Sequence, residues 1–155
     1  MKIKVGDKLE NIKLNSIDDK SFELNKALGK KILLTFYRFA ACPMCNLRIN
    51  EINKTYSSFG ENFIHVAIFD SKLENLKRFT KKHNAKFPIL ADESYQYFEK
   101  YEVERSFVKF IWSQIIRANR QFAAYFKGYL PITFKGHLTT MPVDILINEK
   151  GIVEK

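Results

Sequence analysis

The two cysteines of this chain, Cys42 and Cys45, lie three positions apart in the segment FAACPMCNLRI of residues 39–49. Residues three apart in the first turn of a helix lie about 5–6 Å from each other, which overlaps the separation that a disulfide spans. Such a pair can be oxidised and reduced locally. The sequence therefore makes a redox dithiol the leading hypothesis, with half of a metal site or two small core residues as alternatives.

The elements around the cysteines are those that such a dithiol needs. The run KKILLTFYRF, residues 30–39, is nearly all apolar and rich in β-forming residues, which is typical of a strand buried on both faces of a parallel sheet. Pro43 suits the first position of a helix, and apolar residues then recur every three or four positions until Gly60. This pattern places Cys42 at the N-cap and Cys45 at the start of the inward-facing stripe.

The local charges favour a thiolate at Cys42. A helix N-terminus presents free N–H groups and a partial positive charge, which lower the pKa of a nearby thiol. Arg38 and Arg48 flank the pair, whereas the nearest acidic residues along the chain are more distant. We therefore predict Cys42 as the nucleophile, Cys45 as the shielded resolving thiol, and the two arginines as supporting residues.

The alternatives are weaker on the same residues. A zinc site needs four ligands, and the histidines do not have the spacing of a zinc finger, so we expect neither a metal nor a cofactor. We interpret His65 as a core or edge histidine of a strand and His83 as a surface residue. A purely structural pair would explain Cys45, but Ser or Asp would cap the helix better than Cys42.

The rest of the chain alternates strands and helices, which indicates an α/β fold in a single domain of residues 1–155. Two short strands, NIKLN and SFELN, form a predicted hairpin. The other expected elements are a strand at 62–69, a helix at 70–85, a strand at FPILAD, a helix at ESYQYFEKYEV, and two closing strands within 140–155.

Residues 104–139, here called the insert, interrupt this alternation. They are rich in aromatic residues and hold six Lys or Arg residues against one acid, Glu104. Their first part is predicted to be one long helix, because one side of it collects Val108, Ile111, Trp112, Ile115 and Phe122. We expect this helix to cover the sheet. The alternative is an aromatic, basic surface that binds an anionic partner or a membrane interface, in a non-catalytic binding or redox-sensing module.

The strand, the Cys-x-x-Cys motif and the helix together resemble the thioredoxin-like superfamily. The segment VGDKLENIKLNSIDDKSFELNKALGKKILLTFYRFAACPMC is similar to the peroxiredoxin-like branch, the alkyl hydroperoxide reductase/thiol-specific antioxidant group, as are FPILAD and TMPVDILINEKGIV. The resemblance implies a thioredoxin-like fold with an N-terminal β-hairpin, a central mixed sheet flanked by helices, and a helical insert before the cis-proline strand. It makes Pro142 the cis-proline that faces the dithiol, and Met141 the residue whose backbone binds substrate.

The resemblance leaves two substrates open. Peroxiredoxins place Pro and Thr seven and three positions before the peroxide-attacking cysteine, but Thr35 and Phe39 hold those positions before Cys42. The usual activating arginine near the penultimate strand is also replaced, because Pro142 stands there. The Cys-Pro-Met-Cys motif is instead similar to disulfide oxidoreductases. We expect a peroxide or a disulfide as substrate, and a thioredoxin-like or glutathione-like thiol as external reductant.

The composition of the chain predicts which partners it does not bind and in which compartment it lies. The net charge of +9 is scattered, and no nucleic-acid-binding motif accompanies it, so we expect no nucleic-acid partner. No run is apolar enough for a membrane span or a secretory signal, which predicts a cytoplasmic protein without a membrane partner. A thioredoxin-like fold packs another helix after the strand that GIVEK begins; a homodimer that covers this surface is our hypothesis.

Overall fold

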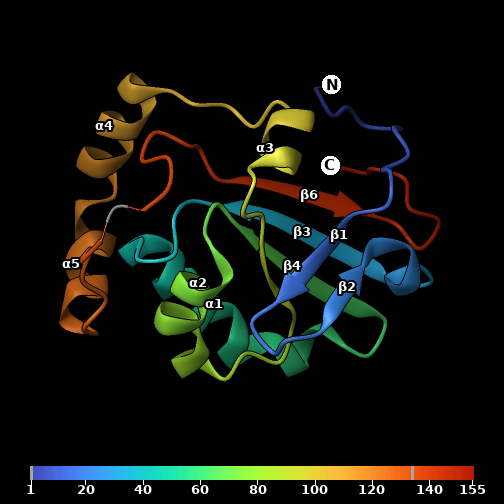
Figure 1. Ribbon diagram of the computed structural model, residues 1–155, viewed down its shortest axis with the longest axis horizontal. Coiled ribbons are helices and arrows are strands. Elements are labelled where there is room, and N and C mark those ends of the chain that lie inside the picture. The colour runs from blue at the N-terminus through green and yellow to red at the C-terminus, as the bar shows by residue number, and fades with distance from the viewer. Residues whose placement is uncertain (1, 134) are drawn as a thin grey trace.

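Six strands form one mixed sheet in the computed structural model, which describes residues 2–133 and 135–155 (Figure 1). Their order across the sheet is β2-β1-β5-β4-β3-β6. The strands are β1 (Lys13–Ser16), β2 (Ser21–Glu23), β3 (Lys31–Tyr37), β4 (Phe63–Phe69), β5 (Ile89–Ala91) and β6 (Val143–Ile147). Strands β3, β4 and β5 are parallel, whereas β6 is antiparallel to β3, and β1 is antiparallel to both β2 and β5. The predicted N-terminal hairpin and mixed sheet are confirmed.

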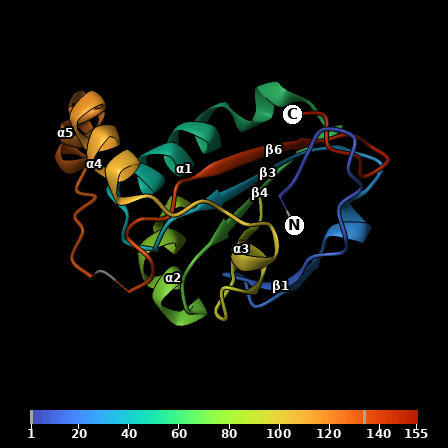
Figure 2. The ribbon, with the colours of Figure 1, turned by 90° about the horizontal axis from the view of Figure 1, so that it is seen from above.

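Helices connect the parallel strands, because a parallel connection needs a crossover. The α-helices are α1 (Pro43–Thr55), α2 (Leu73–Thr80), α3 (Gln96–Lys100), α4 (Phe107–Ile116) and α5 (Ala118–Phe126). Short 3-10 turns lie at η1 (Leu24–Ala27), η2 (Tyr56–Phe59) and η3 (Lys81–His83). The two views show α1, α2 and α3 packed along the sheet, and α4 and α5 beyond its end (Figure 2).

The sheet is buried on both faces, as the apolar run of β3 predicts. Alternate β3 residues belong to different cores: Leu34 and Phe36 pack in the cluster that contains Phe98 of α3. Tyr37 packs in the second cluster, which contains Cys45 of α1. The strand that precedes the cysteines is therefore held from both sides, and this fixes where helix α1 begins.

Helix α1 starts where the sequence predicts. Cys42 is its N-cap and Pro43 its first residue, and the helix continues into η2 before the chain turns at Gly60. Gly60 has φ 82°, in the left-handed region that a residue without a Cβ adopts at little cost. Cys45 and Ile49 are buried on the side that faces the sheet. The strand and the helix that present the cysteines are thus confirmed.

The insert differs from its prediction in two ways. Its helical part consists of two helices, α4 and α5, which meet at Arg117, rather than one long helix. The expectation that it covers the sheet is wrong, because α4 has no buried residue and α5 packs against α1 and α4 instead. The apolar period predicts one apolar side, but it carries no information about what that side contacts. Phe134, also in the insert, lies outside the described residues.

The predicted cis-proline is wrong: the Met141–Pro142 bond is trans, as are all peptide bonds among the described residues. A trans bond is favoured before proline by about 0.5–1 kcal/mol unless tertiary contacts oppose it. Here the contacts suit an extended trans segment, because the Met141 N–H donates to the Glu104 carbonyl at 2.8 Å and Thr140 pairs with Arg105. The helical insert does precede strand β6, as predicted.

The end of the chain adds two single bridges instead of a full strand. Val153 pairs with Ile147 of β6, and Ile152 pairs with Lys8 near the N-terminus, both antiparallel. The segment therefore lies beside β6 as predicted.

Candidate active site

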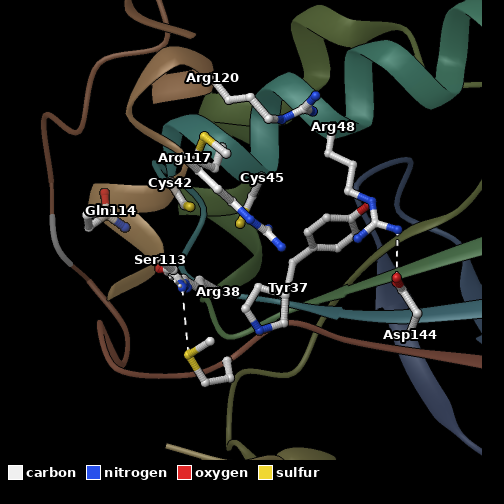
Figure 3. Close-up of a pocket in the computed structure, with 13 residues that line it drawn as sticks. Tyr37, Arg38, Cys42, Cys45, Arg48, Ser113, Gln114, Arg117, Arg120 and Asp144 are labelled. Atoms are coloured by element: carbon white, nitrogen blue, oxygen red, sulfur yellow. Dashed lines mark hydrogen bonds and ion pairs between the residues drawn. The ribbon is translucent and has the colours of Figure 1, made fainter. Parts of the chain in front are cut away.

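The predicted site residues come together around one pocket at the end of the sheet (Figure 3). Its volume is about 230 Å³. Residues from β3, α1, the insert and the start of β6 line it: Tyr37, Arg38, Cys42, Met44, Cys45, Arg48, Ser113, Gln114, Arg117, Arg120, Met141, Pro142 and Asp144. All six residues that the sequence singled out are among them.

The two cysteines are free thiols, and both are buried at the head of α1. The hydrogen bond from the Cys45 thiol lowers the pKa of Cys42, and so do the charge of Arg38 and the backbone N–H groups of Cys45 and Met44; burial opposes them. Burial raises the pKa of Cys45 well above its ordinary value, and the Cys42 sulfur adds to this. The pair is therefore polarised, with the negative charge favoured on Cys42 and the proton on Cys45.

Arg38 is the positively charged side chain that helps to lower the pKa of Cys42. It is only 5% exposed, and its Nε donates to the Thr140 carbonyl at 2.8 Å. Its Nη2 lies 3.5 Å from Ser113 Oγ and 3.9 Å from Met141 Sδ, and its guanidinium carbon lies 5.0 Å from the centre of the Phe110 ring. A buried charge is screened much less than an exposed one, so the Arg38 charge adds to the Cys45 hydrogen bond in lowering the pKa of Cys42.

Asn46 and His83 hold the loop that carries Cys42, and the sequence analysis did not identify this pair. The Asn46 Nδ2 donates to the Ala40 carbonyl at 2.8 Å and to the Cys42 carbonyl at 3.0 Å. His83 Nε2 donates to Asn46 Oδ1 at 2.8 Å. His83 is 7% exposed, so its interpretation as a surface residue is wrong. The residues around it in the sequence are polar, which suggested exposure, but its side chain points inward and bonds to Asn46.

Arg48 lies on the pocket and is paired with two other residues that line it, Asp144 and Tyr37. Its Nη2 forms an ion pair with Asp144 Oδ2 at 2.7 Å, and Asp144 Oδ1 accepts a hydrogen bond from Thr35 at 2.8 Å. The Arg48 guanidinium lies over the Tyr37 ring, 6.0 Å from its centre. Arg48 therefore ties α1 to β6 and forms a wall of the pocket, whereas Arg38 is the arginine that lowers the pKa of Cys42.

The insert contributes four pocket residues that sequence reasoning missed: Ser113, Gln114, Arg117 and Arg120. Arg120 pairs with Glu51 of α1 at 2.6 Å, which fastens α5 to α1. The Arg117 side chain reaches into the pocket between the cysteines and Tyr37 (Figure 3) and has no ion-pair or hydrogen-bond partner among the described residues. Ser113 and Arg117 are four residues apart, so the sequence could have predicted that they share the polar side of this helix.

Met141 and Pro142 line the pocket from the segment that leads into β6. The Met141 N–H is bonded to the Glu104 carbonyl, and its sulfur approaches Arg38. In this structure Met141 therefore offers the pocket its side chain, since its N–H is already used.

Other kinds of site have less support. Among residues 2–133 and 135–155, no three His, Cys, Asp or Glu side chains gather in a way that could hold a metal ion. His65 is a core residue, as interpreted: its Nδ1 donates to the Leu33 carbonyl at 3.1 Å, and its Nε2 lies 3.4 Å from the Tyr37 hydroxyl. Within the same described ranges, no helix has the length and apolar character needed to cross a bilayer.

Solved structures share this fold. The chain superposes on a PrxQ variant from Xylella fastidiosa with a TM-score of 0.74 and 15% identity, covering 100% of this chain and 85% of that one. The peroxidoxin BcpB from Mycobacterium tuberculosis gives a TM-score of 0.71 and 16% identity, covering 97% and 82% of the two chains. Fold and dithiol position together define a thioredoxin-like protein.

The chain belongs to the AhpC/TSA family, whose model matches residues 5–155. It is 26% identical to the peroxiredoxin Bcp of Bacillus subtilis over 104 residues, 66% of each chain, and 26% identical to the Bcp of Escherichia coli K12 over 149 residues, 94% of each. The thiol-disulfide oxidoreductase ResA of Bacillus thuringiensis is 24% identical over 104 residues, 66% of this chain and 60% of that one. Several matches thus span no more than about two thirds of the relative's length. The predicted peroxiredoxin-like branch is confirmed.

Proposed function

We propose that this protein is a thiol peroxidase in which Cys42 attacks the peroxide and Cys45 resolves the product. The observation that carries the proposal is the polarised cysteine pair: the Cys45 thiol and Arg38 lower the pKa of Cys42, while Cys45 keeps its proton. Because the thiolate is the reactive form of cysteine, this assigns different roles to the two sulfurs. Similarity to the peroxiredoxin Bcp proteins supports a peroxide as the substrate.

The proposed peroxidase cycle has three steps. The Cys42 thiolate attacks one oxygen of the O–O bond, which breaks; Cys42 becomes a sulfenic acid, and the alcohol leaves after taking up a proton. The Cys45 sulfur then attacks the Cys42 sulfur, and the hydroxyl leaves as water with the Cys45 proton. An external dithiol reduces the resulting disulfide to two thiols and is itself oxidised.

The pocket supports the first step in two ways. Arg38, fixed by the Thr140 carbonyl, stabilises the thiolate before the attack. Arg117 places a second guanidinium in the pocket, where it can stabilise the negative charge that develops on the leaving oxygen. These two arginines are proposed to take the part of the activating arginine whose usual position is held by Pro142.

The proposed partners follow from this cycle. The peroxide is the substrate and a thioredoxin-like or glutathione-like thiol the reductant, and a reducing compartment such as the cytoplasm suits both. The homodimer stays a prediction, which a light-scattering mass would test; a mass of one chain would contradict it.

A second candidate is thiol–disulfide exchange without peroxidase activity. The observation that favours it is the spacing of Cys42 and Cys45 on one helix turn, together with similarity to ResA, a thiol-disulfide oxidoreductase. In this reaction the Cys42 thiolate attacks a substrate disulfide, and Cys45 then displaces the substrate from the mixed disulfide. Both candidates use the same two sulfurs.

Parallel assays on the reduced protein separate the candidates. Peroxide consumption and reduction of a disulfide substrate are measured for the wild type, Cys42→Ser and Cys45→Ser. If the protein is a peroxidase, the wild type consumes peroxide and Cys42→Ser does not. Cys45→Ser consumes one equivalent of peroxide and stops at the Cys42 sulfenic acid, which dimedone labels.

Turnover of the disulfide alone, with mixed disulfides trapped in Cys45→Ser, would replace the peroxidase proposal with the exchange reaction. Activity in neither assay with any thiol reductant would leave the binding or redox-sensing module as the better interpretation.

A further inference from the structure

The outward side of the insert exposes an unusual amount of apolar surface. On α4 the side chains of Val108, Ile111, Trp112 and Ile115 are 65%, 41%, 60% and 65% exposed, and on α5 Phe122 and Phe126 are 61% and 90% exposed. We call these six residues the insert face. The spacing of the four α4 residues puts them on one side of that helix. Soluble proteins rarely leave contiguous patches of such residues uncovered unless the patch contacts something.

The insert face is exposed because the opposite sides of α4 and α5 are the ones that pack on the rest of the protein. The opposite side of α4 carries Phe110, Ser113 and Gln114, which are half-buried, and Phe110 and Ser113 pack against Arg38 of the thiol pocket. On α5, Ala124 is fully buried, and Arg120 pairs with Glu51 of α1. The helices are therefore held by their inner sides, and their orientation keeps the insert face in the solvent.

The charges of the insert favour one kind of binding partner for the insert face over another. The insert carries six basic residues against one acid, Glu104, which is paired with Lys109 at 2.7 Å. Two of the six, Arg117 and Arg120, line the thiol pocket, and the exposed residues Arg105, Lys127 and Lys135 supply the positive charge outside it. The whole chain has a net charge of +9. A second copy of this chain would bring the same positive charge against it, whereas an anionic surface would be complementary. Exposed Trp, Phe and Ile side chains beside Lys and Arg are the composition of helices that lie in a membrane interface.

We propose that the insert face docks on an anionic bilayer, with its apolar side chains in the interface and the exposed basic residues outside the thiol pocket, Arg105, Lys127 and Lys135, attracted to the lipid headgroups. The protein then lies on the membrane and does not span it. Ser113 and Gln114, on the other side of α4, line the thiol pocket, so docking would place this pocket close to the membrane surface. This proposal reverses the expectation of no membrane partner, and it does not depend on which reaction the thiols perform.

The chain carries its own probe for this contact, because Trp112 is its single tryptophan. Trp112 emission is measured while vesicles of phosphatidylglycerol are added to the full chain, with phosphatidylcholine vesicles in parallel, and the bound fraction is measured by co-sedimentation. The expected result is a shift of the emission to shorter wavelength and co-sedimentation with phosphatidylglycerol only, both reversed by high salt because screening weakens the headgroup attraction.

A variant keeps the probe and removes its apolar neighbours. Ile111→Gln with Ile115→Gln retains helix-forming residues beside Trp112 and should lower the partition coefficient by about tenfold or more, because the lost apolar burial no longer favours the interface. Phe59→Ser is the matched control: Phe59 is 48% exposed but follows α1, far from the insert in sequence, and should bind vesicles like the wild type. Circular dichroism checks that each variant is folded.

Four results would overturn the proposal. The first is an unchanged Trp112 emission with both vesicle types, the second is equal binding to both lipids, and the third is binding by the double variant equal to that of the wild type. The fourth is a Trp112 shift that depends on protein concentration without lipid, together with a light-scattering mass of two chains, which would assign the insert face to a second copy. The peroxide assay on the same samples is independent of these outcomes.

Discussion

Acidification should destabilise this protein through two buried histidines, His65 and His83. Burial lowers the pKa of each to about 4, with the charges of Arg48 and Lys82 acting in the same direction on His65 and His83 respectively. In the unfolded chain a histidine titrates near pH ~6.5. Between these two values the unfolded chain binds more protons than the folded protein, so the free energy of unfolding falls as the pH falls.

The size of the effect follows from the two pKa values. Lowering the pH from about 7 to about 5 removes about 2 kcal/mol of unfolding free energy for each histidine, hence about 4 kcal/mol together. This is a large part of the roughly 5–15 kcal/mol that stabilises an ordinary domain.

Urea unfolding at both pH values measures this loss directly. His65→Gln and His83→Gln cannot titrate in this range, so each single variant should show about half of the wild-type difference between the two pH values, and the double variant little of it. Comparing differences within each variant removes the stability that the substitution itself costs. A double variant that loses as much stability on acidification as the wild type would refute the assignment to these histidines.

Three further predictions concern the pocket. Asn46→Ala should lower the unfolding free energy by about 1–3 kcal/mol, because it leaves the Ala40 carbonyl and His83 without the amide that bonds them, while the Cys42 carbonyl keeps the backbone N–H of residue 46; urea unfolding measures this, and a change below about 0.5 kcal/mol would contradict it. Arg38→Met should raise the pKa of Cys42, read from the pH dependence of its alkylation, whereas Arg38→Lys should restore part of the shift; an unchanged midpoint would contradict the role of Arg38. Arg117→Gln should lower kcat/KM for peroxide about tenfold, because the leaving oxygen loses a charged hydrogen-bond donor, and Arg117→Lys should keep part of the activity; an unchanged kcat/KM in Arg117→Gln would contradict the role of Arg117.

The central part of the fold was predictable because its signals are local. The apolar run of β3, Pro43 at the first helical position and Gly60 at the following turn each determine the backbone nearby. Together they place Cys42 and Cys45 at the head of α1, and the resemblance to a known family extends this to the mixed sheet.

The rest depends on contacts between distant residues. Ser113 and Arg117 line the same pocket as the cysteines only because α5 packs against α1 and holds α4 beside it, and nothing in the local sequence of the insert predicts this packing. The apolar period of the insert predicts an apolar side of α4 but not that it faces solvent. In the same way, the run Lys81–His83 is polar along the chain, and only the position of Asn46 explains why His83 is buried.

The most direct test of the proposed active site is the reactivity of each thiol in the folded, reduced protein. The rate of alkylation by iodoacetamide is measured as a function of pH, and mass spectrometry assigns the modified sulfur. The proposed polarised pair predicts that Cys42 reacts with a midpoint below that of an ordinary cysteine, while Cys45 stays unmodified until the protein unfolds. Equal reactivity of both thiols, or a Cys42 that reacts only on unfolding, would contradict it.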